Sequence, residues 1–151
     1  MRHIICFGNS LHGDDGFGTA VYQRLSKLPL PSDTHLFDAG TPGLNAMALF
    51  SNCSEAIIVD AIAPQGKPGR LHYLRPQELV IESSLPGHGL GVAYLLQAIF
   101  ALDEPMPDIH ILGVEVMKVT SFTPGLSGPV ARAVDQAIEC LSPYFEMQGN
   151  E

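Results

Sequence analysis

The stretch from Ile4 to Leu28 constrains the fold more than any other part of the chain. It opens with a short apolar run, residues 4–7, which is typical of a buried strand. A glycine-rich loop, residues 8–18, follows this run. Apolar residues then recur close to helical spacing, at Phe17, Val21, Leu25 and Leu28. The segment therefore predicts a strand, a tight loop at the carboxyl end of that strand, and a helix.

The loop carries two adjacent carboxylates, Asp14 and Asp15, and no lysine or arginine. Glycine-rich turns at helix N-termini often bind phosphate, because free N–H groups and the helix dipole attract anions. Here two carboxylates already occupy the position where a phosphate would bind, so a cation is the expected ligand. The glycine spacing fits neither the dinucleotide fingerprint nor the P-loop. The alternative interpretation is that both acids simply cap the helix and complement its dipole.

The rest of the chain alternates apolar runs with turns and predicts one α/β domain over residues 1–151. Strands are expected at residues 34–37, 56–59 and 109–114, and helices at residues 44–50, 90–102 and 129–145. The loop at 63–69 is too short for a crossover helix, so residues 70–74 are expected to form an antiparallel edge strand. Residues 75–86 are expected to be mostly irregular. This order predicts a three-layer sandwich, with helices on both faces of a mainly parallel, twisted, five-stranded sheet.

Charge and cysteine content limit the class of partner and the compartment. The formal net charge of -8 argues against nucleic acid or an anionic membrane as the main partner. Three scattered cysteines indicate neither a zinc knuckle nor a disulfide framework, and Cys6 and Cys140 are expected to be core residues. The first apolar run is too short for a signal peptide. A cytoplasmic monomer is the expectation.

Three acids, Asp15, Asp38 and Asp60, each follow the carboxyl end of a predicted parallel strand. Ligands of open α/β sheets bind at this edge, above all where the strand order reverses. His88 lies in a glycine- and proline-lined turn before a predicted helix, from which it could reach the same edge. Carboxylates with an imidazole suit nickel or zinc better than magnesium. Taken singly, each Asp could instead be a turn former or a helix cap, and His88 could be an exposed surface residue.

Several motifs together resemble the hydrogenase maturation protease family. They are Gly8-Asn9-x-x-x-Gly13-Asp14-Asp15-Gly16-x-Gly18, Asp38-x-Gly40-Thr41-x-Gly43, Ile58-x-Asp60-Ala61 and His88. Members of this family are endopeptidases that trim the C-terminal extension of the large subunit of nickel–iron hydrogenases. The resemblance runs over nearly the whole chain. It implies a metal-contacting trio of Asp15, Asp60 and His88, where the first position is Glu or Asp in the family.

The resemblance also implies that the nickel belongs to the immature substrate and signals that metal insertion is complete. No tightly bound cofactor of the protein's own is then expected, and the partner is the precursor of the large subunit. A site with only three protein ligands leaves coordination positions open, so it can share an ion that another protein already holds. We predict that Gly40, Thr41 and Gly43 contact the substrate.

The catalytic group is harder to assign, because the sequence has no Ser-His-Asp pattern and no H-E-x-x-H. Water could be polarised by nickel or activated by a carboxylate. Asp38 is the predicted carboxylate, although it could instead order the turn at residues 40–43. Two other functions stay open: a metallohydrolase with its own zinc or nickel that acts on a small substrate, and a non-enzymatic chaperone that checks for nickel. A nucleotide-binding module ranks last, because residues that contact phosphate are missing.

Overall fold

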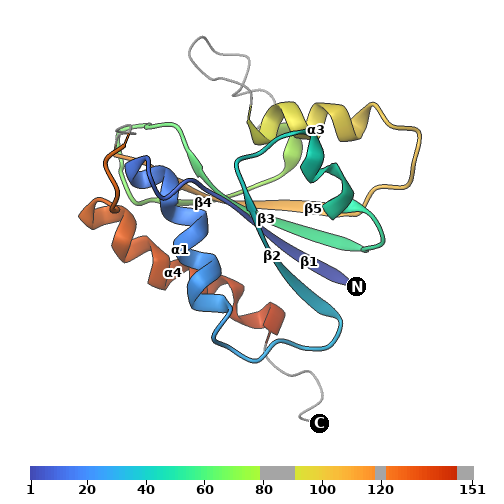
Figure 1. Ribbon diagram of the computed structural model, residues 1–151, viewed down its shortest axis with the longest axis horizontal. Coiled ribbons are helices and arrows are strands. Elements are labelled where there is room, and N and C mark those ends of the chain that lie inside the picture. The colour runs from blue at the N-terminus through green and yellow to red at the C-terminus, as the bar shows by residue number, and fades with distance from the viewer. Residues whose placement is uncertain (79–90, 118–121, 146–151) are drawn as a thin grey trace.

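A five-stranded sheet forms the centre of the computed structural model, which describes residues 1–78, 91–117 and 122–145 (Figure 1). The strand order is β2-β1-β3-β5-β4. The strands are β1 (Arg2–Phe7), β2 (Thr34–Gly40), β3 (Glu55–Ile62), β4 (Leu71–Leu74) and β5 (Asp108–Glu115). All neighbouring strands pair in parallel except β4, which pairs antiparallel with β5 at the edge. The expected mainly parallel sheet with one antiparallel edge strand is confirmed.

Helices cover both faces of this sheet (Figure 1). Helices α1 (Phe17–Leu25) and α4 (Gly128–Phe145) pack on one face. On the other face lie α3 (Val92–Phe100) and the 3-10 helix η2 (Leu44–Phe50). A 3-10 turn, η1 (Gly13–Gly16), leads directly into α1. The three-layer sandwich is therefore confirmed, and none of the described helices is long and apolar enough to cross a bilayer.

Alternation along the strands produces two separate apolar cores. Ile4 and Cys6 of β1 face the core beneath α1 and α4, whereas Ile5 and Phe7 face the core beneath η2 and α3. All four side chains are fully buried. Because β1 is covered on both faces, its sequence is a continuous apolar run rather than an alternating one.

Some local predictions differ from the structure. Strands β2 and β3 are longer than expected. Backbone pairing extends β2 to Gly40, which pairs with Phe7, and extends β3 to Ile62, which pairs with Glu115. Residues 44–50 form a 3-10 helix, and residues 76–78 are helical where irregular chain was expected. Cys6 is buried as predicted.

The prediction that Cys140 lies in the core is wrong, because Cys140 is exposed on α4. The buried stripe of α4 consists of Val130, Ala133, Val134, Ala137 and Leu141. This stripe follows helical spacing and leaves position 140 outside it.

Two glycines of the first loop allow backbone segments to approach one another closely. A Cβ on Gly18 would lie 1.8 Å from the carbonyl oxygen of Phe7, so only glycine lets α1 cross the end of β1 at this distance. A Cβ on Gly8 would lie 2.9 Å from the carbonyl oxygen of Asp15. The glycine-rich loop thus packs helix against strand, which brings η1 to the edge of the sheet.

We expect Gly18→Ala to lower the free energy of unfolding by roughly 3 kcal/mol, because the added methyl group collides with fixed backbone rather than with a flexible side chain. Gly128→Ala is the matched control, since a Cβ there would meet the movable end of Arg132 at 3.3 Å. Urea denaturation of the two variants and the parent protein measures both effects. Equal destabilisation by both substitutions would contradict the close approach of helix and strand.

Candidate functional site

The predicted acids gather where the order of the sheet reverses. Strand β1 lies between β2 and β3. The chain passes from β1 to β2 on one side, and it then returns across β1 to form β3 on the other side. Such a switch point opens a crevice at the carboxyl ends of the strands. Turn η1, which carries Asp15, packs against β3, which carries Asp60 near its end. Strand β2 carries Asp38 on the other side of β1.

Asp15 and Asp60 are half-buried and close enough to repel each other. Burial raises the pKa of Asp60 well above its usual range, and the nearby charge of Asp15 raises it further, although the Ala61 N–H donates to Asp60 Oδ1 at 2.8 Å. Burial also raises the pKa of Asp15, while His12 and the Asn9 N–H lower it in part. Two ionised carboxylates are therefore disfavoured here unless a cation lies between them.

Asp38 belongs to the same edge but leaves the sheet on the opposite face. It pairs in register with Cys6, and alternation places its exposed side chain on the α1–α4 face, whereas Asp60 shares the α3 face with Ile58. After burial itself, the charges of Asp38 and then Asp60 are the main causes that raise the pKa of the Cys6 thiol. Both carboxylates are thus near Cys6, and Asp38 flanks the Asp15–Asp60 pair without joining it. These differences between Asp38 and Asp60 come from strand register.

The turn after Asp38 is open and is fixed mainly by backbone contacts. The Gly8 N–H donates to the carbonyl oxygen of Gly40 at 2.9 Å, and Gly40 has a φ of 66°, which favours glycine. Gly43 accepts a hydrogen bond from the Ala46 N–H at 2.9 Å, at the start of η2. Thr41 is exposed between them. The substrate contacts predicted for Gly40, Thr41 and Gly43 remain predictions.

Asp14 has a structural role, and the sequence alone did not separate this role from that of Asp15. Asp14 is 2% exposed, and its side chain accepts three hydrogen bonds from the described residues. The donors are the Met117 N–H at 2.9 Å, the Ser127 N–H at 2.6 Å and the Ser127 hydroxyl at 2.9 Å. Asp14 therefore ties the loop to the end of β5 and to the start of α4. No pattern in the sequence indicates which of two adjacent aspartates turns inward.

Of the two histidines His12 and His88, the structure describes one. His88, the third predicted metal ligand, lies outside the described residues. His12 is half-buried, its ring centroid lies 5.3 Å from that of Phe122, and it is near enough to Asp15 to lower that carboxyl's pKa. His12 therefore lies at the border of the site.

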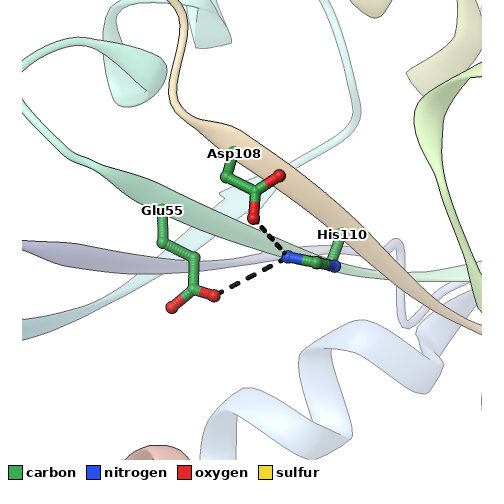
Figure 2. Close-up of side chains that lie close together, drawn as sticks. All are labelled: Glu55, Asp108 and His110. Atoms are coloured by element: carbon green, nitrogen blue, oxygen red, sulfur yellow. Dashed lines mark hydrogen bonds and ion pairs between the residues drawn. The ribbon is translucent and has the colours of Figure 1, made fainter.

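A second group of ligating side chains lies at the opposite edge of the sheet, at the amino ends of the strands (Figure 2). His110 Nε2 lies 2.9 Å from Asp108 Oδ2 and 3.7 Å from Glu55 Oε2. Arg2 Nε lies 2.6 Å from the other oxygen of Glu55, and Arg75 Nη2 lies 3.2 Å from the other oxygen of Asp108. The charges of the two carboxylates are thus already balanced by two guanidinium groups.

Proton positions also argue against a metal at this second group. Arg75 Nη1 lies 3.2 Å from His110 Nδ1, and because a guanidinium only donates, Nδ1 must accept. The ring proton is therefore on Nε2, where it is donated to Asp108. This hydrogen bond is the main cause that lowers the pKa of Asp108. An ion on Nε2 would force a proton onto Nδ1, facing Arg75, so we assign the group to an ion-pair network.

Comparison with known proteins identifies the family. The model of the hydrogenase maturation protease family (HycI) matches residues 19–143, which is most of the chain. The chain belongs to the hydrogenase maturation protease family. The match includes Asp38 and Asp60, and the acidic loop before residue 19 lies outside it.

Individual relatives agree with this assignment to the hydrogenase maturation proteases. A protein of Methanocaldococcus jannaschii, described as a candidate hydrogenase maturation protease, is 34% identical, over 91% of this chain and 92% of its own. Hydrogenase 3 maturation protease of Escherichia coli is 24% identical, over 93% and 88%. The solved hydrogenase maturating endopeptidase HybD from E. coli superimposes with a TM-score of 0.75 at 25% identity, over 94% of this chain and 92% of HybD. The protein is thus an enzyme, an endopeptidase of the hydrogenase maturation type.

For this hydrogenase maturation protease we expect Asp60→Asn to stabilise the fold at pH 7 and to abolish function. Because the folded pKa of Asp60 is raised, the folded state binds more protons than the unfolded chain between the two pKa values. The parent protein therefore loses stability as pH rises above about 3.9, the ordinary Asp value. Asn carries no charge and can still accept from the Ala61 N–H, so the variant avoids this loss. Melting temperatures at pH 7 and below pH 4 measure the difference, which should shrink at low pH.

The control for this experiment is Asp103→Asn, because Asp103 is exposed in the loop after α3. It should change the free energy of unfolding by less than about 0.5 kcal/mol at either pH. If Asp60→Asn behaved like this control at pH 7, the carboxyl of Asp60 would not be strained by burial and by Asp15.

Proposed function

We propose that this endopeptidase removes the C-terminal extension of the large subunit of a nickel–iron hydrogenase after nickel insertion, and that it recognises the nickel held by the precursor. The observation that carries the proposal is the pair of half-buried carboxylates, Asp15 and Asp60, at the switch point of the sheet. Among the described residues, none of the ion pairs with Lys, Arg or His involves these two acids. A divalent cation would relieve their repulsion and their desolvation.

The chemistry of the donor set favours an ion that is shared with the substrate. Two carboxylates, with the imidazole of His88 as the predicted third ligand, suit a borderline metal such as nickel. Three protein ligands leave coordination positions for the groups that already hold the nickel in the precursor. The ion is therefore part of the substrate, and the enzyme needs no tightly bound metal of its own.

Asp38 is the proposed general base or water-positioning group. It is exposed, it lies at the carboxyl end of β2, and strand alternation separates it from the Asp15–Asp60 pair. A carboxylate outside the ligand set keeps its lone pairs available to take a proton from water. The open turn at residues 40–43 directly after it is where we propose that the substrate backbone lies.

We expect cleavage to depend on nickel in the precursor. Chelator-treated enzyme should cut the nickel-loaded precursor and leave the nickel-free precursor intact, because without the ion Asp15 and Asp60 have no metal in the precursor to coordinate. Asp15→Ala, Asp60→Ala and His88→Ala should each leave the loaded precursor uncut, whereas Asp103→Ala should cut at the parent rate. The readout is the gel shift of the large subunit.

Three outcomes would contradict the proposal, and the last two would point to the competing functions. Efficient cutting of nickel-free precursor by chelator-treated enzyme would contradict nickel recognition. Stable binding of loaded precursor without any cutting by the parent protein would indicate a nickel-checking chaperone. A metal that copurifies in stoichiometric amount and is needed for hydrolysis of a small substrate would indicate an ordinary metallohydrolase.

We also expect Asp38→Asn to separate binding from cutting. The amide cannot take a proton, so the rate of cleavage should fall roughly 10²- to 10⁴-fold, the usual contribution of a general base. Association with the nickel-loaded precursor, measured by co-elution in gel filtration, should stay within about twofold of the parent protein. Loss of both together would instead assign Asp38 to the structure of the turn.

A further inference from the structure

Three large apolar side chains are exposed beside the acidic loop, and we call them the apolar rim: Leu11, Met117 and Phe122. Their exposed fractions are 53%, 48% and 79%. Burying such side chains is favourable, so each one left in water loses part of its hydrophobic free energy. Isolated exposed apolar residues are normal, but three that border one site indicate a contact surface.

Backbone contacts hold the rim to the loop that carries Asp15. The Met117 N–H donates to the buried carboxylate of Asp14 at 2.9 Å. Residues 12 and 123 form a parallel β-bridge, and the Gly13 N–H donates to the carbonyl oxygen of Thr123 at 2.9 Å. Leu11 and Phe122 are the chain neighbours of the two bridged residues. The rim is thus fixed relative to the site, rather than placed on an independent loop.

Phe122 is the most informative member, because both its backbone and its side chain are unfavourable in isolation. Its φ is 58°, in the left-handed region that a bulky L-residue rarely adopts. Its ring meets the ring of His12 at a centroid distance of 5.3 Å and is otherwise mostly in water. Strain of this kind persists where the surrounding structure imposes it, and it often marks a ligand contact.

We propose that the apolar rim holds an apolar side chain of the protein substrate next to the peptide bond that is cut, with Phe122 as its main contact. The inference rests on the proposed function, because it takes the precursor as the substrate. An endopeptidase must hold an extended segment on both sides of the scissile bond, and the rim directly borders the loop of Asp15. An anionic bilayer is a poor alternative occupant, because carboxylates adjoin the rim and the chain has a net charge of -8.

The test compares four variants on the nickel-loaded precursor: Phe122→Ala, Phe122→Leu, Phe122→Asn and Phe100→Ala. Phe122→Ala and Phe122→Asn should lower kcat/KM about tenfold, mainly through KM, as expected for loss of an aromatic contact. Asn tolerates positive φ, so it tests the loss of the ring without adding strain. Phe122→Leu should keep a kcat/KM closer to that of the parent enzyme than Phe122→Ala does, because leucine still supplies an apolar contact. Phe100→Ala is the control, because this ring is 38% exposed at the end of α3 that leads toward the amino edge of β5.

Melting temperatures separate recognition from folding. Phe122→Asn should melt at or above the temperature of the parent protein, because it relieves the left-handed strain. Apolar residues flanking the cleaved bond are then replaced by Ala, one at a time, in the precursor. The residue that contacts Phe122 should lose its effect in the Phe122→Ala enzyme, as interacting positions do in a double-mutant cycle.

Failure of the inference can be told apart from failure of the proposed function. If the parent enzyme cuts the precursor and Phe122→Ala cuts it with unchanged KM, the apolar rim is not a substrate contact and the proposed function stands. If the effects of the enzyme and precursor substitutions are additive at every flanking position, Phe122 does not contact a side chain near the cleaved bond, and the inference is overturned. If the parent enzyme leaves the loaded precursor uncut, both ideas fail.

Discussion

The buried carboxylate of Asp14 is the interaction on which the geometry of the site depends. Its hydrogen bonds from described residues join the first loop to Met117 and to Ser127, which lie more than a hundred positions later in the chain. A carboxylate that accepts several hydrogen bonds in the interior is costly to replace, because each donor would be left unpaired. Fixing Asp14 inward also determines the direction of its neighbour. Asp15 can therefore lie at the carboxyl edge of the sheet without an ion pair to any described Lys, Arg or His residue.

The two edges of the sheet treat their acids in opposite ways. At the amino edge, Glu55 and Asp108 are each paired with an arginine, and His110 connects them. At the carboxyl edge, among the described residues, Asp15 and Asp60 have no such partner and keep raised pKa values. The first arrangement is complete as it stands and stabilises strand ends. The second is incomplete among the described residues, which fits the proposal that a cation carried by the substrate completes it.

The sequence was sufficient to predict the sheet and the edge at which Asp15, Asp38 and Asp60 gather, but not the different environments of neighbouring acids. Continuous apolar runs identify β1 and β3, because strands covered on both faces exclude polar residues. Pattern alone could not show that Asp38 and Asp60 lie within strands, because pairing with neighbours extends each strand past its last apolar residue. Nor could it show that Asp38 and Asp60 leave opposite faces, which is a matter of register. The inward turn of Asp14 depends on contacts with residues after 116, which no local pattern reveals.

An enzyme with a resident metal needs ligands that bind the ion tightly in the absence of substrate. Desolvated carboxylates with raised pKa values make such tight binding less favourable. Burial and mutual repulsion disfavour the ionised form of both carboxyls, which is the form that coordinates an ion, so they oppose tight binding of free nickel. An ion delivered by the substrate requires the same ionisation of the carboxyls. In that case, contacts between the protein substrate and the rest of the sheet edge offset part of the free energy that ionisation costs. Under the proposed function, metal and polypeptide bind better together than separately, which is the thermodynamic meaning of one serving as a signal for the other. The pair of half-buried carboxylates, Asp15 and Asp60, thus fits the proposed recognition of a nickel-loaded precursor better than it fits storage of nickel.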